Sequence, residues 1–487
     1  MPLDDIIKAR RDKLEKLKKA NVNPYPAKSW RTHAVSQAIN QFDKLSEEKT
    51  PLALAGRIMA RREHGGATFI DIYDGTGRIQ ALVKKDAIGN REYEFFSQTV
   101  DIGDIIEVSG RLFTTKKEER TLEAEKYRIL AKSLLPLPEK WHGLQDVEER
   151  FRKRYLDLLL NEDVRKKFEM RSRIMQEIRN FFIEKEFLEV VTPVLQPLYG
   201  GASARPFKTR LHALDMEVFL RIAPELYLKR LLVGGFEKIF EFTTNFRNEG
   251  IDRDHNPEFA AVEFYAAYKD LDWAMDLTEE LFDRVVKNVK GDMIIPYQNT
   301  KVSFQKPYAR ATFVDLLKKH ANLDYDNDDE KGLRGKAENL GIKIDKVVGK
   351  AGLADEIFKK AIRPKLVDPI FVTNYPAELL PLAKRLENSD YVGAFQFYAG
   401  GLELIKAFSE LNDPIDQRER FEAQEQNRAK GDEEAQRLDE DYIEALEYGM
   451  PPAAGWGLGL DRLIALLTDS HSLREVILFP LMKPRDD

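Results

Sequence analysis

The chain has 487 residues, 43% of them hydrophobic and 33% charged, which is typical of a soluble globular protein with two or three domains. Its 77 basic side chains are outnumbered by 83 acidic ones, so no global positive field attracts nucleic acid, and such a partner must meet local basic patches. Cysteine is absent, which excludes disulfides, thiolate zinc sites and a cysteine nucleophile. No apolar run is long enough to span a membrane, and the start "MPLDDIIKAR" lacks the features of a signal peptide. We therefore expect a cytoplasmic protein with no membrane partner.

Residues 4–20 have the charge spacing of a helix, and seven of the residues from Lys8 to Lys19 are basic. A solvated helix face and an RNA-contacting arm explain this pattern equally well. The segment belongs to an expected helical extension over residues 1–45.

Short β-rich runs extend from Leu52 to about Leu135, with Gly-rich turns and no expected helices between them. This spacing predicts a small β-barrel. The segment "LPLPEKWHG", residues 135–143, interrupts the runs with two prolines and a glycine, and predicts the domain boundary.

The rest of the chain mixes helices and strands. Apolar residues at helical intervals, including Phe168, Ile174, Ile178 and Phe181, predict two amphipathic helices over residues 146–160 and 163–187. Strand-like runs at 216–223, 238–243 and 260–268 then alternate with further helices, including the charged stretch 416–446.

The segment "TTNFRNEGIDRDHNPEF", residues 243–259, has an unusual density of polar groups. Arg247 and Glu249 are two residues apart, so on a strand they would share one face. An arginine offers a bidentate fork to phosphate or carboxylate, and a carboxylate accepts from an amino group. Arg253, His255 and Asn256 follow, and the ring of Phe259 could stack on a base. Taken singly, Arg247 could be a structural ion pair and His255 a satisfied loop histidine, but together these residues suit a nucleotide.

Near the C-terminus, "GWGLGLDRLIALLTD", residues 455–469, places alternate glycines before an Asp-Arg pair and an apolar helical run. Glycines allow a ligand to approach the backbone closely, and an arginine at the helix start would reach that ligand. The pattern alone is weak, and Asp461 could be a helix cap. The sequence has neither a P-loop nor a Rossmann fingerprint, so a nucleotide would need a different site.

Three segments of the chain resemble the signature motifs of class II aminoacyl-tRNA synthetases. "FRNEGIDRDHNPEF" resembles their motif 2, "GLGLDRL" their motif 3, and "FLEVVTPVLQP", residues 187–197, their motif 1 at the dimer interface. The strings "LLPLPEKWHG", "RYLDL", "GGASARPF", "LRIAPELYLKRL" and "AFSELNDP" are similar to class II lysyl-tRNA synthetases in order and spacing. The resemblance covers nearly the whole chain.

The resemblance implies an α+β fold: an OB-fold anticodon-binding barrel over residues 46–140, and a catalytic domain over 141–487 with a mostly antiparallel sheet flanked by helices. It implies a homodimer that joins lysine to ATP, giving lysyl-adenylate and pyrophosphate, and transfers lysine to the 3′ end of the lysine tRNA. Magnesium is the implied cofactor.

The resemblance also implies residue roles. Arg247 and Arg462 would be catalytic. The implied ATP site is Arg247, Glu249, His255, Asn256, Phe259, Glu403 and Arg462, with Glu403 and Glu410 as magnesium ligands. The implied lysine site is Gly201, Glu225, Arg247, Glu263, Tyr265, Lys406, Phe408 and Glu410. Arg62, Phe69 and Gln80 would read the anticodon, although Phe69 could instead be a core residue of its strand.

The sequence departs from the family pattern at two positions. Gln396 replaces a glutamate seven residues before Glu403, and Lys406 replaces an asparagine four residues before Glu410. Two interpretations stay open: the Lys406 ammonium takes over part of the work of one magnesium ion, or it pairs with Glu403 or Glu410 while the metals bind as usual. Strand parity places Glu403 opposite to Lys406 and Glu410, so a β-bulge is expected if both acids meet ATP.

Two other classes of function are open. A paralogue could activate a lysine-like amino acid and load it onto something other than tRNA, but it would have little reason to keep the barrel segment "ATFIDIYDGTGRIQ". A non-catalytic RNA-binding protein would be expected to lose Arg247 or Arg462, and both are present.

Overall fold

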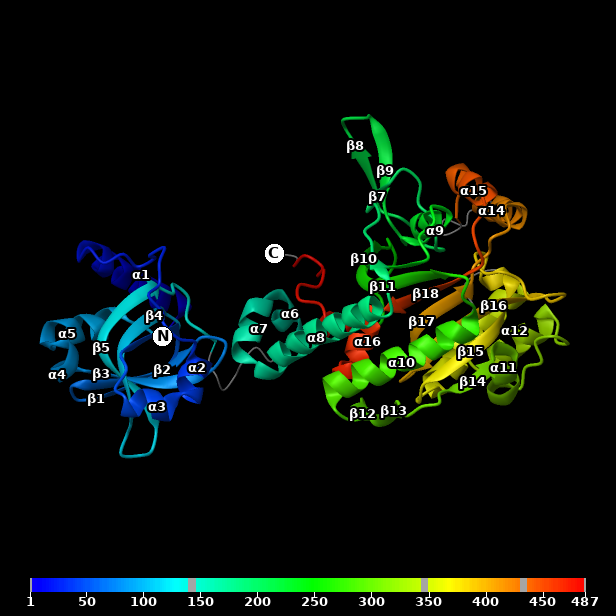
Figure 1. Ribbon diagram of the computed structural model, residues 1–487. Coiled ribbons are helices and arrows are strands. Elements are labelled where there is room, and N and C mark those ends of the chain that lie inside the picture. Colours follow the sequence, from blue (N-terminus) through cyan, green and yellow to red (C-terminus); the bar gives the residue numbers. More distant parts are fainter. Residues whose placement is uncertain (1, 139–145, 343–348, 430–435, 486–487) are drawn as a thin grey trace. The chain divides into compact units, whose positions relative to one another are not determined.

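The computed structural model describes residues 2–138, 146–342, 349–429 and 436–485, and the chain divides into two units, Met1–Val147 and Glu148–Asp487 (Figure 1). The boundary predicted at residues 140 and 141 lies outside the described residues. None of the helices in the described ranges has both the length and the apolar character needed to cross a membrane.

The N-terminal unit contains the predicted barrel. It closes in the order β1-β2-β3-β5-β4, formed by β1 (Leu52–His64), β2 (Ala67–Tyr73), β3 (Arg78–Lys84), β4 (Ile105–Thr114) and β5 (Arg120–Ala131). Alternate side chains such as Ile70 and Ile72 are fully buried in the barrel. Two helices that the sequence did not predict, α4 (Lys85–Ile88) and α5 (Asn90–Thr99), lie between β3 and β4.

The predicted helical extension is not a separate body. It forms α1 (Leu3–Lys19), α2 (Val35–Asn40) and α3 (Phe42–Glu47), and its apolar side chains belong to the barrel's core cluster. On α1, the buried Arg10 donates to the carbonyl oxygens of Ile102, Ser133 and Leu135. One of the seven basic residues of this helix is therefore a packing residue, whereas Lys8, Arg11 and Lys16 are exposed.

The C-terminal unit is built on an eight-stranded sheet in the order β14-β15-β16-β17-β18-β11-β10-β6. All neighbouring pairs are antiparallel except β14 with β15 and β10 with β6, which confirms the predicted mostly antiparallel sheet. The strands are β6 (Leu188–Glu189), β10 (Lys238–Phe246), β11 (Glu258–Ala267), β14 (Ala309–Thr312), β15 (Ile370–Pro376), β16 (Tyr391–Ala399), β17 (Leu402–Ser409) and β18 (Ala453–Gly459). Smaller sheets are formed by β7 (Leu195–Gln196), β8 (Lys208–Leu211) and β9 (Met216–Leu220), and by β12 (Ile294–Tyr297) and β13 (Thr300–Ser303).

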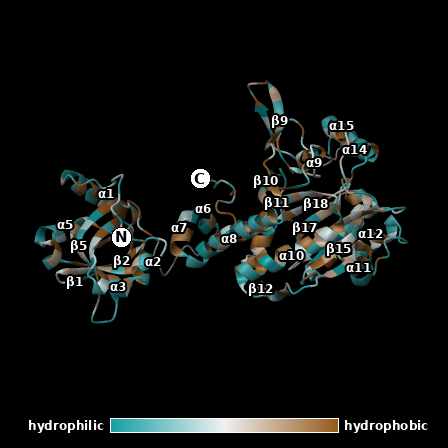
Figure 2. Cartoon of the chain, viewed as in Figure 1, coloured by the Kyte–Doolittle hydropathy of each residue, from teal (hydrophilic) through white to brown (hydrophobic). Residues whose placement is uncertain are grey.

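Helices cover the sheet. On one face, α8 (Glu162–Glu184), α10 (Leu271–Lys290) and α16 (Leu460–Leu467) pack their apolar sides against the strands in one large core (Figure 1). Along α10, hydrophobic residues alternate with hydrophilic ones, as in an amphipathic helix (Figure 2). The remaining helices are α9 (Glu225–Val233), α11 (Phe313–Ala321), α12 (Glu330–Asn339), α13 (Lys350–Ile357), α14 (Pro414–Ala429) and α15 (Glu440–Glu447).

Two helix predictions were wrong in extent. The stretch 146–160 forms two helices, α6 (Val147–Arg152) and α7 (Arg154–Leu160), because Lys153 between them leaves the helical conformation with φ −109° and ψ 46°. The charged stretch 416–446 is shared between α14 and α15, and residues 430–435 lie outside the described part of the chain.

Candidate active site

The alternate glycines of β18 line a cavity over the eight-stranded sheet. The strand lies between β11 and β17, where Gly457 is paired with Glu263 on one side and Lys406 on the other, and Gly455 with Tyr265 and Phe408. Trp456 and Leu458 face the opposite way, into the core. A Cβ at position 455 would lie 1.7 Å from Oε1 of Glu410, so only glycine fits there.

A cavity of about 480 Å³ lies over these glycines. All fourteen residues predicted for the ATP, lysine and metal sites line it: Gly201, Glu225, Arg247, Glu249, His255, Asn256, Phe259, Glu263, Tyr265, Glu403, Lys406, Phe408, Glu410 and Arg462. They come from segments more than 200 residues apart in sequence. The size of the cavity suits a small-molecule ligand.

One end of the cavity is acidic. Glu225, Glu410 and the phenol of Tyr265 are buried there, and Glu263 lies on the same face of β11 as Tyr265. Burial and the nearby carboxylate of Glu225 raise the pKa of Glu263 to about 8. Isolated carboxylates in such a place favour a cation as a partner.

The chain itself supplies one cation at this end. Lys229, fully buried on α9, lies with Nζ 2.6 Å from Oε1 of Glu225 and also pairs with Glu410. Burial lowers the pKa of Lys229, but the two carboxylates outweigh this effect and hold the pKa above its usual value. The sequence analysis missed Lys229, although its position four residues after Glu225 places both on one face of a helix.

Arg247 lies between the acidic end and the rest of the cavity. Its guanidinium group makes no ion pair or hydrogen bond to any described residue, and its buried Nε has no partner. Cζ lies 5.0 Å from the ring centroid of Phe259. The interpretation of Arg247 as a structural ion pair is therefore wrong. The condition under which Arg247 and Glu249 would share one face of a strand is not met, because β10 ends at Phe246 and both residues follow it.

His255 lies on the loop that follows. Its Nδ1 is 2.9 Å from a carboxylate oxygen of Asp252, and its Nε2 is 3.5 Å from Nη2 of Arg462. The histidine is therefore satisfied within its loop and also reaches the arginine at the start of α16. Asp461 is not a helix cap, because it accepts from the backbone N–H of Ala260 and pairs with Arg171 at 2.6 Å, which ties α16 to β11 and α8.

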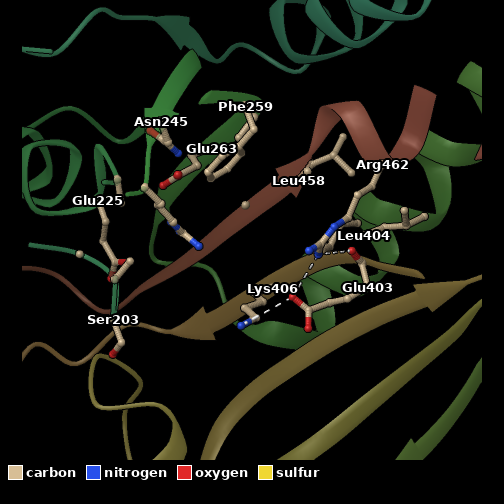
Figure 3. A pocket seen from close by; sticks show the side chains of 18 of the residues that line it. Ser203, Glu225, Asn245, Phe259, Glu263, Glu403, Leu404, Lys406, Leu458 and Arg462 are labelled. Atoms are coloured by element: carbon tan, nitrogen blue, oxygen red, sulfur yellow. Dashed lines mark hydrogen bonds and ion pairs between the residues drawn. The ribbon is translucent and has the colours of Figure 1, made fainter. Parts of the chain in front are cut away.

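Glu403 is surrounded by cations at the other end of the cavity. Nη1 of Arg462 donates to the carbonyl oxygen of Glu403 at 3.0 Å, and Nζ of Lys406 lies 3.6 Å from its carboxylate (Figure 3). Burial raises the pKa of Glu403, but Lys406, Arg462, Lys359 and Arg363 together outweigh it and hold the pKa below its usual value. Glu403 is therefore ionised at neutral pH.

The expected β-bulge is present. Ile405 pairs with Phe397 and Glu403 pairs with Tyr398, so Leu404 is the extra residue on β17. The bulge turns Glu403 to the same face as Lys406. The turn that joins β16 and β17 uses Gly400 and Gly401, both at positive φ.

The prediction that Glu403 and Glu410 are the acidic ligands of magnesium stays a prediction. The two residues are seven apart along β17 and its extension. Glu410 pairs with Lys229 at the acidic end. No group of three or more His, Cys, Asp or Glu side chains in the described ranges could hold a metal ion.

Comparisons with known proteins agree with this geometry. The family described as tRNA synthetases class II (D, K and N) matches residues 146–483, and OB-fold nucleic acid binding domains match residues 52–130. A protein named lysine–tRNA ligase from Carboxydothermus hydrogenoformans is 49% identical to the chain, and the alignment covers 99% of the chain and 99% of that relative. A protein of the same name from Pelotomaculum thermopropionicum is also 49% identical, over 99% of the chain and 96% of its own length. The chain belongs to the lysine–tRNA ligase family. A protein of that name from Enterobacter sp. is 45% identical over 99% of the chain and 97% of its own length.

In this member of the lysine–tRNA ligase family, the three residues predicted to read the anticodon lie on the outside of the barrel. Phe69 alternates with the buried Thr68 and Ile70 and is itself partly exposed, so the interpretation of Phe69 as a core residue is wrong. Arg62 is its direct partner across β1 and β2. Gln80 is likewise partly exposed on β3, opposite Asp71.

Proposed function

We propose that the chain is a lysine–tRNA ligase whose described cavity activates lysine with ATP before transfer to the 3′ end of the lysine tRNA. The observation that carries this proposal is a single cavity with buried carboxylates at one end and cations at the other. Between them lies Arg247, whose guanidinium group has no hydrogen bond or ion pair to any described residue. Free lysine has cationic amino groups and an anionic carboxylate, and ATP is anionic. The charges of the cavity therefore match both substrates.

At the acidic end, Glu263, Tyr265 and Glu410 would surround the ε-ammonium of lysine, with Phe408 against its alkyl chain. Gly201 and Glu225 would hold the α-amino group. Because Lys229 already neutralises part of the charge of Glu225 and Glu410, the three carboxylates are not left to repel one another in the empty pocket.

Arg247 would bind both the lysine carboxylate and the α-phosphate and so hold them for in-line attack. Catalysis would then consist of positioning and charge stabilisation, with no covalent enzyme intermediate. The adenine would stack between Phe259 and Arg462, with its amino group on Glu249 and with His255 and Asn256 toward the base and phosphates.

The site fits one magnesium ion. Mg²⁺ is commonly held by one or two carboxylates together with substrate phosphates and waters, and Glu403 supplies one ionised carboxylate at the cationic end. When bound, the ion would neutralise charge on the phosphates.

The tRNA would be recognised by Phe69, Arg62 and Gln80 through stacking and edge hydrogen bonds, as is common for single-stranded bases on such a barrel. A homodimer is supported by apolar side chains of the 187–197 segment that lie open to solvent in the single chain, among them Leu188, Val191 and Leu195. The lack of cysteine supports a reducing cytoplasm as the site of action.

The test is pyrophosphate exchange into ATP with each amino acid in turn, followed by charging of the lysine tRNA. We expect exchange with lysine and transfer to that tRNA. Exchange without transfer would instead favour the paralogue that loads another acceptor, and no exchange with any amino acid would overturn the proposal.

A further inference from the structure

Two basic residues that line the cavity have no role in the function proposed above. Lys359 lies in the short π-helical segment Phe358–Ile362, and Arg363 begins the 3₁₀ turn Arg363–Lys365 that follows it. π-Helical turns inside helices are frequent at functional sites. Both side chains lie close enough to Glu403 to act on its carboxyl group.

The fold fixes this basic segment beside Glu403. The backbone N–H groups of Gly400 and Gly401, in the turn before Glu403, donate to the carbonyl oxygens of Val367 and Leu366 at 2.7 and 2.9 Å. A Cβ at Gly401 would lie 3.6 Å from the carbonyl oxygen of Arg363. The segment is thus held by the same hairpin that carries Glu403 and Lys406.

Arg363 is not used by the protein itself. Its Nε is buried without a partner, and its guanidinium group makes no hydrogen bond or ion pair with any residue in the described ranges. Buried unpaired donors of this kind are rare and call for an explanation. Lys359 is partly satisfied, with Nζ 2.6 Å from Asp355.

The charges around Glu403 are unequal. Lys359, Arg363, Lys406 and Arg462 act on its single carboxylate. Lys359 also pairs with Asp355, but the other three cations still outnumber the carboxylate of Glu403. A multiply charged anion is the natural partner for such a group. Arginine in particular pairs with phosphate through two parallel hydrogen bonds.

We propose that Arg363 and Lys359, together with Lys406, form a binding site for the β- and γ-phosphates of ATP and for the pyrophosphate that leaves. This inference rests on the proposed function, because it takes the substrate to be ATP. The site supplies fixed positive charge where a pyrophosphate group forms. This charge acts on the group whether or not a magnesium ion is also bound at Glu403.

The test is calorimetric titration of the full chain with inorganic pyrophosphate in EDTA, so that no divalent cation contributes. We expect measurable binding that weakens as salt is added. Arg363→Gln should bind pyrophosphate about tenfold or more weakly, as expected for the loss of one charge-assisted hydrogen bond. Lys359→Gln should lose affinity in the same direction.

Lys360→Gln is the matched control. Lys360 lies next to Lys359 on the same segment and pairs with Glu356 at 3.2 Å, but it does not line the cavity. Its removal changes the net charge equally and should leave pyrophosphate affinity within about twofold of wild type, since the group is screened by solvent. The inference would be overturned if wild type, Arg363→Gln and Lys360→Gln all bound pyrophosphate equally well. It would also be overturned if the two variants lost the same amount of pyrophosphate affinity.

Two further measurements distinguish a failure of this inference from a folding defect and from a failure of the proposed function. Thermal unfolding checks each variant, and if Arg363→Gln does not fold, Lys359→Gln decides: a loss of affinity supports the site and unchanged affinity rejects it. Lysine-dependent exchange by the wild-type chain reports on the proposed function. If the wild-type chain catalyses exchange but Arg363→Gln binds pyrophosphate as well as wild type does, only this inference is rejected. If the wild-type chain catalyses no exchange but Arg363→Gln binds pyrophosphate more weakly, only the proposed function is rejected.

Discussion

Nζ of Lys406 lies 3.6 Å from the carboxylate of Glu403, although an odd spacing of three residues would place them on opposite faces of a regular strand. The extra residue Leu404 in the β17 bulge removes this conflict. Lys406 therefore pairs with Glu403, as one of the two interpretations of this residue expects. This pairing alone does not exclude contact with phosphate, because half of the Lys406 side chain is exposed.

Gln396 and Lys406 are direct partners across β16 and β17. Replacing both, with Gln396→Glu and Lys406→Asn, would put a second carboxylate on the face of Glu403 and remove a competing cation. We expect the double variant to bind one more divalent ion, measured by counting Mn²⁺ bound in the presence of ATP. If wild type already binds the same number of ions, Lys406 does not replace any of them.

Arg247→Ala should abolish adenylate formation without damage to the fold, because the guanidinium group has no hydrogen bond or ion pair to lose among the described residues. A charge-assisted hydrogen bond contributes about 1.5–3 kcal/mol, and two ligands share this arginine, so we expect exchange to fall at least ~100-fold. Lysine-dependent pyrophosphate exchange measures the loss, and the melting temperature checks the fold. Exchange within a few-fold of wild type would show that this arginine is not at the reacting centre.

The acidic end predicts strong selection for a cationic side chain. Norleucine, a neutral isostere of lysine, offers no cation to Glu263, Tyr265 and Glu410 and should lose about 10⁴–10⁵ in kcat/KM for exchange. Ornithine keeps the charge and should lose less, about 1–3 kcal/mol for the missing methylene plus any misfit of the ion pair. Comparable activation of norleucine and lysine would contradict the assignment of Glu263, Tyr265 and Glu410.

The raised pKa of Glu263, about 8 against an ordinary 4.5, predicts a pH dependence. Below pH 8 the empty pocket holds a proton on Glu263 that a bound ammonium would displace, so lysine affinity should rise with pH up to about 8. Without lysine, the folded chain binds this proton more tightly than the unfolded chain. Its contribution to the free energy of unfolding is therefore full below pH 4.5 and is lost as pH rises toward 8.

Calorimetry of lysine binding in buffers of different ionisation enthalpy measures the proton released. Glu263→Gln keeps the shape of the side chain and should remove the release. Equal proton release from wild type and Glu263→Gln would assign the linkage to another group.

Phe69→Ala should weaken charging of tRNA and leave lysine-dependent exchange unchanged, because exchange does not use the anticodon. The loss of one stacked base is about 1–3 kcal/mol, so KM for tRNA should rise roughly 5- to 150-fold. Phe113→Ala is the matched control, since Phe113 is a partly exposed phenylalanine on β4 of the same barrel. Equal effects of the two substitutions would show a general disturbance of the barrel.

The amino-acid sequence determined the class of the fold and most of the site. Motif order, the alternate glycines at 455, 457 and 459, and the polar density around Arg247 are local features, and local features can be read directly from a chain. The bulge at Leu404 could also be expected, because strand parity is a property of the sequence.

Other features were decided by the tertiary structure because they depend on which distant segments meet. The partner of Glu410 is one example: its carboxylate meets the ammonium of Lys229, which lies 181 residues earlier in the chain. Lys229 becomes part of the acidic end of the cavity only where α9 packs beside the end of β17, so that one ammonium meets two carboxylates from different elements. Nothing in the local sequence singles out Arg363, and the hydrogen bonds of the Gly400–Gly401 turn are what hold its segment at the cationic end of the cavity. Ion pairs and cavities of this kind form through space between residues far apart in the chain, so register and packing decide them.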